Sequence, residues 1–61
     1  MKSGEVIKLL EEDGWKLVRV NGSHHIYKKE GVAELISISH PEKDMSRLQL
    51  SKVRRISGLD F

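Results

Sequence analysis

The dipeptide Asn21-Gly22 lies between two runs rich in β-branched and aromatic residues, and it restricts the fold of this chain more than any other feature. Asn-Gly in that setting is the strongest short-range signal for a β-hairpin, because both residues tolerate the positive φ angles of tight hairpin turns. A weaker turn signal, Glu30-Gly31, precedes a third run of the same kind at 32–39. The sequence therefore predicts a three-stranded antiparallel meander.

Amphipathic segments flank the predicted strands on both sides. In the first, Ser3 is suited to cap a helix, and Gly14 favours a left-handed end that turns Trp15 back onto that helix. In the second, apolar residues recur at helical spacing from about Ser46, and Gly58 follows the last turn. The predicted fold is of the α+β class with the order α-β-β-β-α, in which two helices cover one face of the three-stranded antiparallel sheet.

Length and composition exclude several classes of protein. With 61 residues, the chain is predicted to form a single domain at 1–61 that is too small for a deep pocket. The absence of cysteine removes disulfides and thiolate metal sites. No apolar run is long enough to cross a bilayer, and no hydrophobic signal segment begins the chain, so we expect a cytoplasmic protein without a membrane partner.

Charge is unevenly distributed along the chain. Residues 15–29 contain four cations and no anion, although the formal net charge of the whole chain is only +2. A basic strand beside histidines suits a phosphate ester, but a solvated charged face would have the same composition.

The two adjacent histidines must point to opposite faces of a sheet. If both turns have two residues, Arg19 lies opposite His24 and the other face gathers apolar side chains around His25. Arg19, Lys28 and Ser37 are easier to leave on an open face than to bury beneath helices. We therefore expect His24 to face out and His25 to face the core, hydrogen-bonded to backbone or to a hydroxyl.

The open face is also predicted to carry an apolar patch. Its members are Trp15, Leu17, Ile26 and Leu35. Contiguous exposed apolar patches are unusual on free monomers, so this one indicates a protein partner.

Several of these residues resemble the HicA family of bacterial and archaeal toxins. The resemblance spans nearly the whole chain, including the "SHPEKDM" loop and the "SGL" that ends the last helix, and it is most specific at Gly14, Trp15, Arg19 and the block 22–25. It implies the fold of double-stranded-RNA-binding domains and cleavage of mRNA without a cofactor by the histidine after Gly-Ser. It also implies neutralisation by a HicB-type antitoxin. In this sequence the histidine after Gly-Ser is His24.

RNA carries its own nucleophile, the 2′-hydroxyl, so a small protein can cleave it by moving protons and stabilising charge on the phosphate. Histidine, with a reference pKa of ~6.5, suits the proton transfer, so we assign His24 as general acid or base. Arg19 and Lys28 are expected to bind the phosphate, with Gly22 and Ser23 supporting the site.

Two other classes of function stay open. The chain could be a non-catalytic RNA-binding module of the same fold, or an interaction protein whose basic face binds an acidic partner. No metal site is predicted, since His24 and His25 point apart and leave no set of three or four ligands. His40, in a loop beside Pro41, could contact RNA but does not make a site alone.

Overall fold

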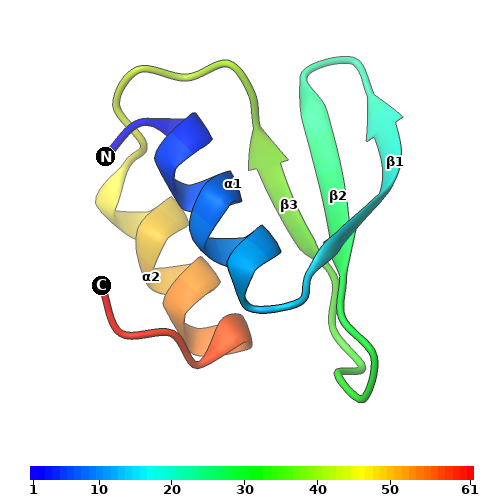
Figure 1. The fold of residues 1–61 in the computed structure, drawn as a ribbon. Coiled ribbons are helices and arrows are strands. Elements are labelled where there is room, and N and C mark those ends of the chain that lie inside the picture. Colours follow the sequence, from blue (N-terminus) through cyan, green and yellow to red (C-terminus); the bar gives the residue numbers. More distant parts are fainter.

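The computed structural model describes residues 1–61 and has five elements, in the predicted order. They are α1 (Ser3–Glu12), β1 (Lys16–Asn21), β2 (His24–Lys28), β3 (Ile36–Ser39) and α2 (Arg47–Ser57). The strands form one antiparallel sheet in the order β1-β2-β3. Both helices lie on the same side of the sheet and contact β3 (Figure 1). The predicted α+β fold class and element order are therefore confirmed. Neither helix is long and apolar enough to span a membrane.

The hydrophobic core is small and draws on every element except β1. Eight apolar side chains are buried: Val6, Leu10, Trp15, Tyr27, Ile36, Ile38, Met45 and Val53. All six residues of β1 are exposed. Strand β1 is therefore held by its pairing with β2 rather than by burial beneath the helices.

Glycines end both helices in the predicted manner. Gly14 has a φ of 101°, its N–H donates to the Glu11 carbonyl, and the Trp15 N–H donates to the Leu10 carbonyl at 2.9 Å. These two bonds define a Schellman motif. In α2, Gly58 has a φ of 74° and its N–H donates to the carbonyl four residues earlier. Both predicted helix ends are confirmed.

Ser3 is not the helix cap that the sequence predicted. Lys2 takes the cap position, and Ser3 is the first residue of α1, with only 1% of its surface exposed. Its Oγ accepts a hydrogen bond from the Glu42 N–H at 2.8 Å and lies 2.8 Å from His40 Nδ1. The hydroxyl is thus occupied by a distant loop, and it joins the start of α1 to the segment before α2.

The predicted strand register is wrong by two residues on both sides of β2. The first turn consists of Gly22 and Ser23, so that Asn21 rather than Arg19 lies opposite His24. Gly22 has a φ of 62°, and all residues with a positive φ are glycines, so the φ of Ser23 is negative. This pattern fits a type II′ turn with glycine in the first central position. The second connection is a loop at 29–35, which places Ser39 opposite His24. Because side chains alternate with a period of two, both histidines keep their predicted faces.

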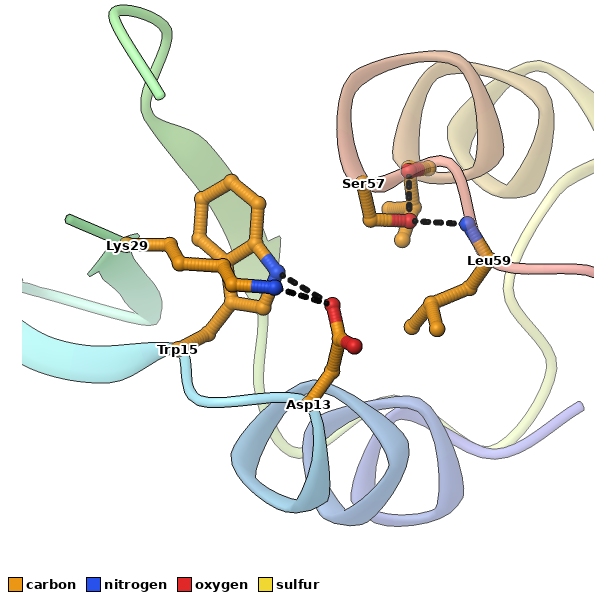
Figure 2. A network of polar contacts seen from close by, with 6 residues as sticks. Asp13, Trp15, Lys29, Ser57 and Leu59 are labelled. Carbon is orange, nitrogen blue, oxygen red and sulfur yellow. Dashed lines mark hydrogen bonds and ion pairs between the residues drawn. The ribbon is translucent and has the colours of Figure 1, made fainter. Parts of the chain in front are cut away.

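The predicted apolar patch does not form. The Schellman turn carries Trp15 back over α1 into the core, where it is 2% exposed. Its indole N–H donates to the Asp13 carboxylate, which also pairs with Lys29 Nζ at 3.0 Å (Figure 2). A β-bulge between Leu17 and Arg19 brings Leu17 opposite Tyr27 instead of Ile26.

The other two residues of the patch also differ from the expectation. Leu35 is 47% exposed but precedes β3, so it does not belong to the sheet. Ile26 is half-buried on the open face, in the same row as Arg19 and Ser37. The four residues therefore do not share one surface.

Candidate nucleic-acid interface

His24 begins β2, directly after the two-residue turn, and its side chain is exposed. It lies opposite Asn21 and Ser39, whereas His25 lies opposite Ile38, which is fully buried beneath the helices. His24 is therefore on the open face of the sheet, as predicted, and His25 is on the helix side.

The basic residues predicted to assist His24 lie at different distances from it. Arg19 lies one row along the sheet, opposite Ile26 on the same face, and such a diagonal position is within reach of a long side chain. Lys28 is four residues along β2, which at ~3.3 Å per residue places its Cα roughly 13 Å from that of His24. Arg19 can therefore share a phosphate with His24, and Lys28 would contact a neighbouring one.

The open face is free of carboxylates along all three strands. The ion pairs of the protein lie elsewhere, between Lys29 and Asp13, between Arg55 and Glu34, and between the amino terminus and Asp44. The cations of the strands, Lys16, Arg19 and Lys28, are thus left without protein partners and are exposed. A surface of this kind attracts polyanions.

A groove of about 220 Å³ lies between β3 and α2, and His24 is one of its lining residues. The others are Ile36, Ser37, Ser39, Gln49, Lys52, Val53 and Ile56. Sequence reasoning missed Gln49 and Lys52. Helical spacing would have placed both on the same side of the helix as Val53 and Ile56, because Lys52 and Val53 each lie three or four residues from Gln49 and from Ile56. Nothing in the sequence shows that this side of the helix adjoins His24.

His25 and His40 hold the turn that carries His24. The Ser23 carbonyl oxygen accepts the His40 backbone N–H at 2.8 Å and lies 3.2 Å from His25 Nδ1. The two rings meet edge to face, with centroids 5.2 Å apart. The expected bond from His25 to backbone is thus present. Because a carbonyl oxygen only accepts hydrogen bonds, His25 Nδ1 must carry a hydrogen in this contact.

The histidines do not gather around a common point. No group of three or more His, Asp or Glu side chains is placed to hold a metal ion. Burial and, to a lesser extent, the negative charge of Glu11 raise the pKa of Tyr27. Tyr27 lies on the helix side of the sheet, opposite the buried Ile36, and so takes no part in the open face.

Comparison with known proteins gives two findings that agree with each other. The model of a family described as "HicA toxin of bacterial toxin-antitoxin" matches residues 3–59. A solved structure titled "HicA3 and HicB3 toxin-antitoxin complex" contains a chain with 37% sequence identity and a TM-score of 0.86, and the alignment covers 100% of this chain and 98% of that one. A search of curated proteins returned no match.

Proposed function

Because this chain belongs to the HicA family of toxins of bacterial toxin–antitoxin systems, we propose that it is an endoribonuclease that cleaves mRNA without a metal ion. In this proposal His24 is the general acid or base. The observation that supports it best is the position of His24, which is exposed on a carboxylate-free basic face and lines a groove.

The proposed chemistry uses the 2′-hydroxyl of the RNA as the nucleophile. His24 takes its proton, or gives one to the departing 5′-oxygen, an effect typically worth ~10²–10⁴-fold in rate. Arg19 stabilises the charge that develops on the phosphate. His24 is the only histidine on the open face, and no second acid accompanies it, so we expect a modest turnover rate.

We further propose that a HicB-type antitoxin neutralises the protein by covering His24. A standard interface buries about 800 Å² on each partner. The whole chain exposes 4322 Å², so roughly a fifth of its surface would be covered. Of the apolar contacts predicted from the sequence, Ile26 lies beside Arg19 on the open face and remains in the proposed interface. Leu17, opposite Tyr27 on the helix side, and Leu35, before β3, are nearly half exposed but do not share that face. Trp15 is withdrawn from this set, because it lies in the core.

The proposal is tested by comparing His24→Ala with His25→Ala. We expect His24→Ala to keep its circular-dichroism spectrum and melting temperature while losing RNA cleavage and growth inhibition. His25→Ala, which removes the bond to Ser23 and the contact with His40, should lower the melting temperature. The opposite pattern, with cleavage lost only in His25→Ala, would transfer the catalytic role to His25.

Three further measurements define the reaction. Cleavage should persist in the presence of a chelator, and RNA with a 2′-deoxy substitution at the scissile nucleotide should resist. Activity that disappears on chelation and returns with a divalent ion would contradict the mechanism. RNA that is bound but never cut by the wild-type protein would favour a non-catalytic RNA-binding module instead.

A further inference from the structure

We propose that the groove between β3 and α2 binds the backbone of single-stranded RNA next to His24, with Lys52 as its phosphate-binding cation. This inference rests on the proposed function and names how the same site would hold its substrate. It is carried by the shape of the groove, by its charge and by the free polar groups on its walls.

The groove runs along β3, which forms one edge of the sheet. Helix α2 runs antiparallel to β3 (Figure 1), so Gln49 faces the end of β3 that carries Ser39 and His24, and Ile56 faces the end that carries Ile36. Lys52 lies three residues beyond Gln49, a rise of ~4.5 Å along the helix. The one cation of the groove therefore lies less than one helical turn from the histidine end.

The electrostatics of the groove favour an anion. None of its eight lining residues is acidic, and Lys52 takes part in no ion pair. Lys29 and Arg55, by contrast, are paired with carboxylates away from the groove. A long exposed lysine without a partner is free to place its charge on a phosphate.

The remaining polar groups divide into fixed and free ones. Gln49 is fixed, because its Oε1 accepts the Ser46 N–H at 2.7 Å and its Nε2 donates to Glu42 Oε2 at 3.2 Å. Neither Ser37 nor Ser39 makes a side-chain hydrogen bond within the protein. Their hydroxyls are therefore available to phosphate oxygens or to a ribose 2′-hydroxyl.

The groove has the dimensions of a backbone channel rather than of a base-reading pocket. Its volume of about 220 Å³ leaves no room for a duplex, and apart from the imidazole of His24 it contains no aromatic side chain on which a base could stack. Phosphate contacts fix the register of a strand and carry no sequence information. Lys52 is thus expected to contribute affinity that is the same for different RNA sequences.

The test is binding of single-stranded RNA by the charge-removing variant Lys52→Gln in a His24→Ala background, so that the RNA stays intact. The matched control is Lys8→Gln, because Lys8 is also exposed, helical and without an ion pair, but lies on α1 away from the groove. Fluorescence anisotropy with several oligonucleotides of different sequence gives the dissociation constant as a function of salt concentration. Melting temperatures confirm that both variants are folded.

We expect Lys52→Gln to weaken binding several-fold at low salt for every oligonucleotide. It should also reduce the slope of log K against log salt by about 0.7, the value for one phosphate contact on a single strand. Lys8→Gln should leave that slope unchanged. Equal slopes and affinities for the two variants would overturn the inference, as would a loss that depends strongly on sequence.

The experiment separates this inference from the proposed function. If the wild-type protein cleaves RNA and Lys52→Gln cleaves it with the same KM, the inference fails and the proposed function stands. If RNA is bound in a Lys52-dependent manner but the wild-type protein never cleaves it, the inference stands and the proposed function fails. Absence of any RNA binding would overturn both.

Discussion

Replacing Ser3 by alanine is expected to lower the free energy of unfolding by about 2 kcal/mol, a large effect for a single hydroxyl. Ser3 is the only buried polar residue of the protein. Its Oγ bonds to the Glu42 N–H and to His40 Nδ1, each at 2.8 Å, and the Ser3 N–H donates to the Glu42 carbonyl. The substitution removes both side-chain bonds and leaves the backbone bond in place.

The magnitude follows from three contributions. Each lost hydrogen bond costs about 1 kcal/mol. The part-buried Glu42 N–H and His40 nitrogen would be left without partners, which raises the cost when water cannot reach them. Alanine has a higher helix propensity than serine, which returns up to about 0.5 kcal/mol in the first turn of α1. The sum is close to 2 kcal/mol.

Thermal unfolding followed by circular dichroism measures this change directly. In a domain of this size, 1 kcal/mol shifts Tm by roughly 4–8 °C, so we expect a decrease of roughly 10 °C. Ser51→Ala is the matched control, because Ser51 is an exposed helical serine in α2. If Ser3→Ala melts within 2 °C of Ser51→Ala, the bonds from Ser3 do not stabilise the fold and the reasoning is refuted.

Two other predictions concern the core. Trp15→Ala should remove about 3–5 kcal/mol of stability. This is comparable with the entire stability of so small a domain, so circular dichroism should show an unfolded chain. A folded variant with weakened antitoxin binding would instead restore Trp15 as a partner contact. Burial and, to a lesser extent, the charge of Glu11 raise the pKa of Tyr27 in the folded protein. The unfolded chain therefore loses the phenol proton at a lower pH than the folded protein, so stability should fall as pH rises above ~10. Urea titrations at pH 8 to 11 check this, and Tyr27→Phe should show the smaller decline; identical declines would contradict the assignment.

The parts of the fold that could be predicted from sequence are those fixed by local chemistry. Gly14 and Gly58 adopt left-handed conformations that other residues rarely adopt, so the helix ends follow from the glycine positions alone. The faces of His24 and His25 follow from the alternation of side chains in any strand. These features hold even though the register was wrong, because an error of two residues preserves the alternation.

The parts that could not be predicted depend on competition between turns and on tertiary packing. Asn21-Gly22 and Gly22-Ser23 are both acceptable hairpin turns, and the sequence does not show which of them the strands will use. The bulge at Val18 breaks the alternation in β1 and so moves Leu17 to another row. Lys52 adjoins His24 only because α2 packs against the edge of β3, and a single sequence contains no signal for that contact.

Hydrogen bonds connect the turn of the proposed active site to the buried Ser3. The Ser23 carbonyl is bonded to His40 and His25, and His40 is in turn bonded to Ser3. Through this chain of contacts, the turn that carries His24 is tied to the start of α1 and to the loop before α2. Proton transfer requires a side chain whose supporting residues are fixed. The hydrogen bonds supply that support, because β1 adds nothing to the core beside this turn or elsewhere. A loss of Ser3 should therefore loosen His24 as well as destabilise the fold.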